Sequence, residues 1–96
     1  MDMTITDRAY EWFKEEMNLA EGDHVQFFVR YGGDANFQTG FSLALGVKEP
    51  DEPAVQAEKG GIIFYIEQKD IWYFDNEDFK VEYDEDIGEI RYVHGE

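Results

Sequence analysis

The first third of the chain carries apolar residues at helical spacing. One face of the predicted helix collects Ala9, Tyr10, Phe13 and Met17. Thr6 precedes this stripe, where its hydroxyl can accept from the exposed amides of a first turn, and Asp7 places negative charge at the positive end of the helix dipole. The pattern predicts an amphipathic helix that begins after Thr6, ends before Gly22 and covers a sheet, with Trp12 at its border.

Period-two alternation replaces the helical pattern at His24. Val25, Phe27 and Val29 alternate with more polar residues, and Phe41 to Val47 resumes the pattern after the break at residues 32–36. We therefore expect two strands joined by a Gly-rich connection. Residues 48–61 contain Pro50, Pro53 and three Glu, which predicts a solvated loop.

The second half of the chain alternates short apolar runs with turn residues. It predicts a central strand at 62–67, a short helical turn at 68–74, a turn at 75–78, a strand around 79–83 and a last strand at 87–93. The fold class is α+β: a small β-sandwich or curled mixed sheet with an N-terminal amphipathic helix. Residues 1–96 are expected to form a single domain.

Charge narrows the classes of partner. The 96 residues include 23 acidic and 8 basic ones, for a formal net charge of −15. Such a chain repels nucleic-acid backbones and anionic membrane surfaces, so we expect neither as a partner. The N-terminal residues do not resemble a signal peptide, and the apolar runs have the length of strands, so a cytoplasmic location is expected.

Candidate catalytic residues are few. The chain has no cysteine, which excludes disulfides, thiolate metal sites and cysteine nucleophiles from its own residues. Ser42 lies in a predicted strand without the Gly-x-Ser-x-Gly context of an exposed nucleophile. His24 and His94 have no second histidine at metal-binding spacing and are interpreted as surface histidines. The protein is therefore expected not to be an enzyme.

Other motifs are interpreted structurally. The acidic runs at 75–78 and 84–86 do not follow the calcium-loop pattern and indicate a solvated face. Gly32-Gly33 is not followed by the Lys and Ser or Thr of a phosphate loop, so it is interpreted as a permissive turn. Trp72 and Tyr73 are expected either in the core or in an exposed patch that contacts a partner.

The order of several motifs resembles one known family. The motifs are Thr4-Ile5-Thr6-Asp7, the strand Val25 to Tyr31 ending in Gly32-Gly33, Gly40-Phe41-Ser42-Leu43, Gly61 to Glu67 and Phe79 to Tyr83. Over nearly the whole chain this order resembles the HesB/IscA family of iron–sulfur cluster biosynthesis, and within it the cysteine-lacking HesB-like YneR-type subgroup. The resemblance implies a compact β-sandwich-like fold with a leading helix, and descent from cluster scaffolds or carriers.

The resemblance fails at the cluster ligands. In the family a cysteine follows the Gly-Gly pair and two more lie near the C-terminus, whereas here Asp34 follows Gly33 and the last residues, Tyr92-Val93-His94-Gly95-Glu96, contain no counterpart to that pair. A carboxylate is a hard donor and does not replace a thiolate on a cluster, so no cofactor is expected. Asp34 and His94 are the weak candidates for a mononuclear Fe(II) or Mn(II) site.

Three functional hypotheses follow. The leading one is a non-enzymatic HesB-like protein that acts through protein contacts, with basic or cluster-assembly proteins as partners. The second is a carboxylate-based divalent metal (iron) binding protein. The third is a small enzyme in which burial raises the pKa of Asp34, His24 or Asp75. A homo-oligomer is compatible with the family, but at −15 per subunit it needs an apolar contact.

Overall fold

The described part of the molecule is a helix between two sheets. The computed structural model describes residues 1–32 and 41–94. Its elements are β1 (Met3–Ile5), α1 (Asp7–Glu16), β2 (His24–Tyr31), β3 (Phe41–Val47), β4 (Pro53–Lys59), β5 (Ile62–Glu67), the 3-10 helix η1 (Gln68–Phe74), β6 (Phe79–Asp84) and β7 (Glu89–His94). The α+β fold class with an N-terminal helix is therefore confirmed.

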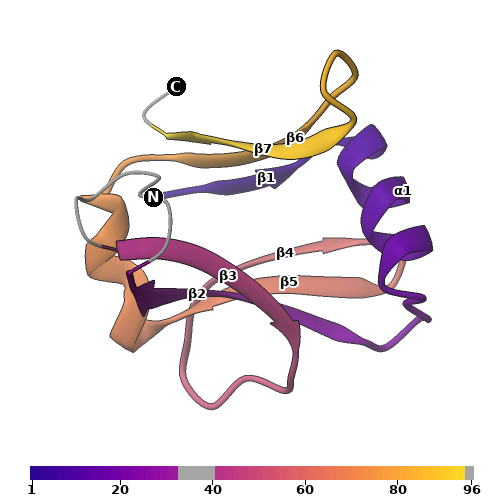
Figure 1. The fold of residues 1–96 in the computed structure, drawn as a ribbon. Helices are drawn as coiled ribbons and strands as arrows, with labels where there is room; N and C mark the ends of the chain where they lie inside the picture. Colours follow the sequence, from indigo (N-terminus) through magenta and orange to yellow (C-terminus); the bar gives the residue numbers. More distant parts are fainter. Residues whose placement is uncertain (33–40, 95–96) are drawn as a thin grey trace.

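Two mixed sheets face each other. The three-stranded sheet has the order β1-β6-β7, and the four-stranded sheet has the order β3-β2-β5-β4. The first strand pairs in parallel with β6, from Met3 opposite Phe79 to Ile5 opposite Val81. Figure 1 shows α1 beside one end of the space between the sheets and η1 beside the other. As predicted, β5 is a central strand, between β2 and β4.

The start of α1 follows the sequence closely. Thr6 is the N-cap, and its hydroxyl accepts a hydrogen bond from the Ala9 N–H at 3.2 Å. Ala9 and Phe13 are fully buried. The helix ends at Glu16, well before Gly22, because the chain already turns into the left-handed region at Asn18, where φ is 52°.

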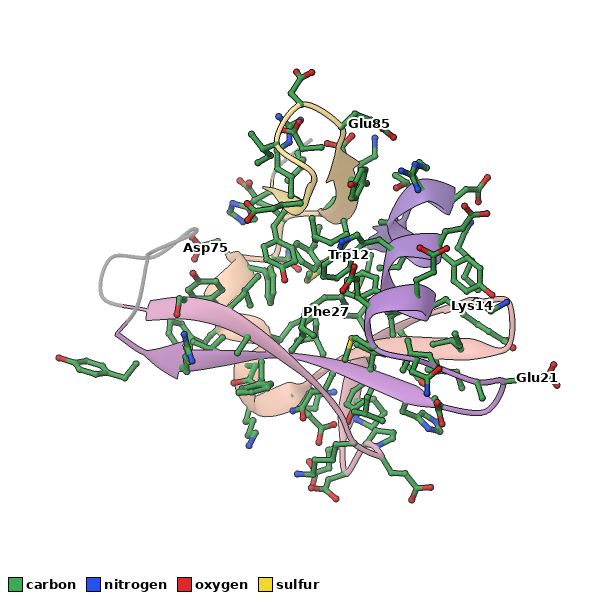
Figure 2. The ribbon with its side chains drawn as sticks, turned by 45° about the vertical axis from the view of Figure 1, so that its right-hand side comes forward. Trp12, Lys14, Glu21, Phe27, Asp75 and Glu85 are labelled. Carbon is green, nitrogen blue, oxygen red and sulfur yellow. The ribbon has the colours of Figure 1, made fainter. Side chains whose placement is uncertain are left out.

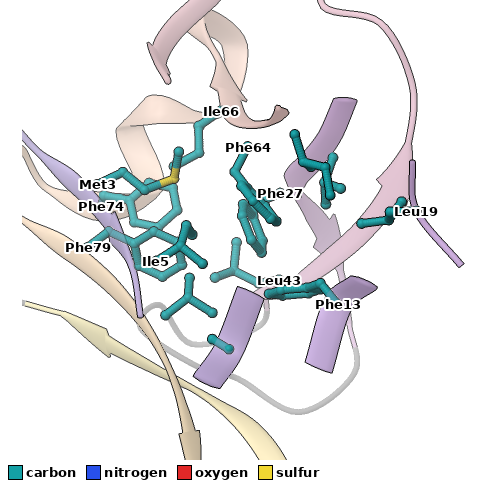
Figure 3. Close-up of a cluster of buried hydrophobic side chains, with 14 of the residues drawn as sticks. Met3, Ile5, Phe13, Leu19, Phe27, Leu43, Phe64, Ile66, Phe74 and Phe79 are labelled. Atoms are coloured by element: carbon teal, nitrogen blue, oxygen red, sulfur yellow. The ribbon is translucent and has the colours of Figure 1, made fainter. Parts of the chain in front are cut away.

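The core between the sheets is aromatic. Phe27 of β2 lies at its centre, with ring centroids of Phe13, Phe79 and Tyr92 at 5.9, 5.7 and 6.0 Å and near-perpendicular ring planes. Such edge-to-face contacts suit the charge distribution of aromatic rings. Figure 3 shows that side chains of both sheets and α1 meet in this cluster. Burial raises the pKa of Tyr92 to about 12, as expected for a phenol held in this core.

The predicted loop at residues 48–61 is partly wrong. Residues 53–59 form β4, which pairs antiparallel with β5 from Pro53 opposite Glu67 to Lys59 opposite Ile62. The prolines of this segment, Pro53 among them, led to the prediction of a loop. Pro53 is the first residue of a strand at the sheet edge, where the missing N–H breaks no internal ladder.

Two further strand predictions differ from the structure. No pattern predicted β1, which has only three residues and depends on its pairing with β6. The last strand begins at Glu89, because Ile87 and Gly88 form the turn that precedes it.

Candidate functional site

The proposed metal ligands do not form a described site. Asp34 lies outside the described residues. His94 ends β7, and its Nε2 lies 2.6 Å from the carbonyl oxygen of Phe74 and 3.8 Å from Glu77 Oε2. Since a carbonyl only accepts, Nε2 carries the proton and donates it, so this nitrogen is not a free metal ligand. Residues 1–32 and 41–94 contain no group of three or more His, Asp or Glu arranged to hold a metal.

The two histidines are less exposed than predicted, whereas Asp75 is exposed in a turn, as its interpretation as part of a solvated face predicts. The side chain of His94 is only 19% exposed, so its interpretation as a surface histidine is wrong. His24 is half-buried, with its ring centroid 6.3 Å from that of Tyr65. Asp75 is exposed in the turn after η1, at a φ of 50°, and Figure 2 shows it pointing outward. The hypothesis of a small enzyme required Asp75 to be buried, and it is not.

A buried carboxylate that sequence reasoning missed fastens the β3–β4 connection. Glu67 is 3% exposed, and its two oxygens accept the backbone N–H groups of Asp51 at 2.9 Å and Glu52 at 3.1 Å. The Gln68 N–H donates to the Glu52 carbonyl at 2.8 Å. Nearby, the Tyr65 hydroxyl donates to the Lys48 carbonyl at 2.5 Å, and burial raises the pKa of Tyr65 to about 12. Both oxygens of Glu67 are therefore used structurally.

A second buried carboxylate, Asp70 on η1, is less well satisfied. It is 7% exposed, and its Oδ2 has no hydrogen-bond partner. Burial raises the pKa of Asp70, while a hydrogen bond from the backbone of Val29 opposes the shift. The pairing of β2 with β5 covers only residues 24–26, so the edge of β2 at Val29 meets η1 instead of a strand. Asp70 therefore accepts a hydrogen bond from β2 at a position where β5 no longer pairs with that strand.

Asp70 also lines a hollow of about 320 Å³ on the four-stranded sheet. Its walls come from β2, the end of β3 and the start of η1, and they consist of Gln26, Phe28, Val29, Gly46, Val47, Lys48, Lys69 and Asp70. The hollow thus combines apolar walls, two ammonium groups and one buried carboxylate.

The turn between β6 and β7 forms a projecting surface element, which we call the acidic hairpin tip (Asp84–Glu89). It contains four acidic residues and one large apolar side chain, Ile87, which is 62% exposed. Figure 2 shows the tip, marked by Glu85, projecting beyond the sheets. An apolar side chain framed by acids is suited to contact with a protein surface that is basic around an apolar spot.

The acidic hairpin tip is held by α1. Arg8 Nε donates to Glu85 Oε1 at 2.8 Å, and the Arg8 guanidinium lies 4.5 Å from the centroid of the Tyr83 ring. The hydrogen bond and the charge of Glu85 raise the pKa of Arg8. The Gly88 N–H closes the turn by donating to the Asp84 carbonyl at 2.8 Å. These contacts order the tip before any partner binds, which lowers the entropy lost on binding.

The predicted aromatic patch on η1 is only half present. Trp72 is 49% exposed, but Tyr73 is fully buried. The two residues are adjacent on a 3-10 helix, so their side chains point in different directions, and only Trp72 contributes to the surface.

Basic side chains are largely neutralised by neighbouring acids. Ion pairs involve Arg8, Lys48, Lys59, Lys80 and Arg91. Glu82 takes part in two of them, and the hydrogen bond from Arg91 lowers the pKa of Glu82 most. Acidic residues nevertheless outnumber basic ones by 23 to 8 in the chain, so the surface field is strongly negative. In the described residues, no helix is long and apolar enough to span a membrane.

Comparison with known proteins finds relatives of this small acidic α+β protein that match nearly its whole length. No family model matches the chain. It is 54% identical over 89 residues to the pyruvate dehydrogenase inhibitor of Bacillus subtilis (strain 168), covering 93% of this chain and 94% of that protein. It is 41% identical over 96 residues to an uncharacterised protein of Staphylococcus saprophyticus, covering 97% and 98%, and 37% identical over 95 residues to one of Staphylococcus haemolyticus, covering 96% of each.

The chain therefore belongs to the family of the Bacillus subtilis pyruvate dehydrogenase inhibitor and these staphylococcal proteins. A relative named as an inhibitor agrees with the expectation of a non-enzymatic protein that contacts another protein. The HesB/IscA resemblance stays a prediction.

Proposed function

We propose that this protein inhibits pyruvate dehydrogenase by binding to it. The observation that carries the proposal is the 54% identity to a protein named for this activity, along almost the whole length of both chains. A net charge of −15 favours a basic contact surface on the enzyme and speeds the encounter with it. The acidic hairpin tip supplies the contact element, with Ile87 as its apolar anchor.

An enzyme assay tests the proposal. The purified protein is titrated into pyruvate dehydrogenase of the same organism while pyruvate-dependent NADH formation is followed. We expect a saturable loss of activity that weakens as salt is added, because ions screen charge attraction. Heat-unfolded protein is the control for nonspecific polyanion effects. Full activity at saturating folded protein, together with no co-elution in gel filtration, contradicts the proposal.

The location and domain structure belong to the same proposal. Residues 1–96 act as one domain in the cytoplasm, and the shared core of both sheets and α1 supports the single domain. Fractionation followed by immunoblotting tests the location, and recovery of the protein in the membrane fraction contradicts it.

A HesB-type ancestry with a role near cluster assembly is the second candidate, supported by the motif order around Gly32-Gly33. In this second candidate function, Asp34 and His94 bind Fe(II) or Mn(II). An anaerobic titration with Fe(II) on the wild type and on His94→Ala separates the two candidates, because inhibition of pyruvate dehydrogenase needs no metal. The absence of saturable heat in the wild type would contradict the hypothesis of metal binding.

A further inference from the structure

The hollow beside η1 contains a polar atom that the fold leaves unsatisfied. Among the described residues, Asp70 Oδ2 is the buried side-chain oxygen or nitrogen atom without a hydrogen-bond partner. Native proteins rarely bury such atoms unpaired, since each costs the hydration it has lost. Asp70 itself lines the hollow, and the terminal torsion of an Asp side chain is broad. Asp70 can therefore accept from a donor placed there.

The charges around the hollow differ from those of the rest of the surface. Lys48 and Lys69 both line it. Lys48 has only a long contact of 3.8 Å to Asp51, and Lys69 takes part in no ion pair among the described residues. A ligand in the hollow therefore meets one carboxylate and two ammonium groups.

We propose that this hollow binds a free α-amino acid with an aliphatic side chain. The ammonium group of the ligand donates to Asp70, its carboxylate lies against Lys69, and its side chain packs on Phe28 and Val47. Such a zwitterion has no net charge, so a protein at −15 does not repel it as it repels an organic anion. The volume of 320 Å³ falls at the small end of ligand sites, which are about 300–1,000 Å³.

Binding also completes the local structure. Asp70 already accepts a hydrogen bond from the backbone of Val29 in β2. A hydrogen bond from the ligand's ammonium group would give its second oxygen, Oδ2, a partner as well. The ligand thus connects η1 to the end of β3, which both contribute residues to the walls of the hollow. This inference goes beyond the inhibition of pyruvate dehydrogenase and does not depend on it.

Isothermal titration calorimetry with L-leucine, L-valine and L-isoleucine on the full chain tests the inference. We expect saturable binding of at least one of them with a stoichiometry near one. Asp70→Asn removes the charged acceptor and should weaken binding roughly 10- to 100-fold, the range for hydrogen bonds to charged groups. Lys69→Gln should also weaken binding. Lys14→Gln, a change of the same kind on the exposed face of α1, should not.

Several outcomes overturn the inference. One is no saturable heat from any of the three amino acids. Another is equal binding of 4-methyl-2-oxopentanoate, which lacks the ammonium group that Asp70 is assigned to receive. The inference is also overturned if Asp70→Asn binds the amino acids with unchanged affinity while circular dichroism shows that it is folded. If Asp70→Asn unfolds, Lys69→Gln decides, because Lys69 is exposed and its substitution leaves the core intact.

Discussion

Arg8 and Glu85 are joined by a hydrogen bond of 2.8 Å although 77 positions separate them in the chain. The bond connects the first turn of α1 to the acidic hairpin tip, and Arg8 also lies over the ring of Tyr83. Both partners are more than half exposed, with side-chain exposures of 54% and 67%, so the pair contributes little to global stability. Its effect is local order in the proposed contact element.

Arg8→Ala should therefore loosen the hairpin tip more than the fold. We expect the amide of Gly88 to exchange with deuterium roughly twofold to fivefold faster, the range typical of an exposed ion pair. The melting temperature should change little. Hydrogen exchange followed by NMR measures the effect, and Lys14→Ala on the same helix is the matched control. Unchanged exchange at Gly88 would show that the tip is ordered without Arg8.

Ile87→Ser tests the tip as a binding element. Ile87 is already 62% exposed, so the substitution should leave the melting temperature within experimental error. Loss of the buried aliphatic contact in the complex should weaken inhibition of pyruvate dehydrogenase about tenfold. Tyr31→Ser is the control, because Tyr31 is also a large exposed side chain, at 86%, but lies at the end of β2. Equal effects of both substitutions would argue against a specific role for the tip.

Glu67→Gln should destabilise the fold. Glu67 accepts two backbone N–H groups, and the amide of glutamine offers one acceptor oxygen and places a donor against the second N–H. We expect a loss of about 1–3 kcal/mol in the free energy of unfolding, measured by urea denaturation. Glu58→Gln, on the exposed surface of β4, should change it by less than about 0.5 kcal/mol.

The raised pKa of Asp70 predicts the sign of a pH effect. Its native pKa lies above the ordinary value of 3.8, so between these two values the native state binds more protons than the unfolded state. Stability from this group is fully present below 3.8 and is lost as pH rises through the native pKa. The stability of Asp70→Asn relative to wild type should therefore rise across this window and stay constant above it. Urea denaturation at stepped pH measures it, and a parallel pair of curves would contradict the assignment.

Local patterns predicted most of the fold. The N-cap at Thr6, the buried face of α1 at Phe13 and the strand around Phe27 depend on nearest neighbours along the chain, and the structure confirms them. The alternation within that strand is confirmed only in part, because Gln26 is buried as well as its neighbours. Of the two strands that were not predicted, β1 depends on a distant partner, β6, whereas β4 pairs with the next strand along the chain, β5. β1 is too short for a pattern of its own, and the sequence of β4 contains Pro53 and Glu58, residues typical of loops.

The surface features were less predictable. Burial of Asp70 results from the place where β5 diverges from β2, which no local signal records. Trp72 and Tyr73 are adjacent in sequence, and only the tertiary structure decides that Tyr73 is buried and Trp72 is not. Asp34, the position matched to the family's cysteine, lies outside the described residues, so its role as a ligand stays a prediction.

The pairing of β1 with β6 also governs the order of events during synthesis. Residues 3–5 are translated well before their partners at 79–81, which lie 76 positions later in the chain. The pairing of β1 with β6 therefore forms only after residues 79–81 have emerged from the ribosome. Such distant pairing slows the search for the native topology, typically to milliseconds or longer, and exposes the nascent hydrophobic segments to chaperones meanwhile.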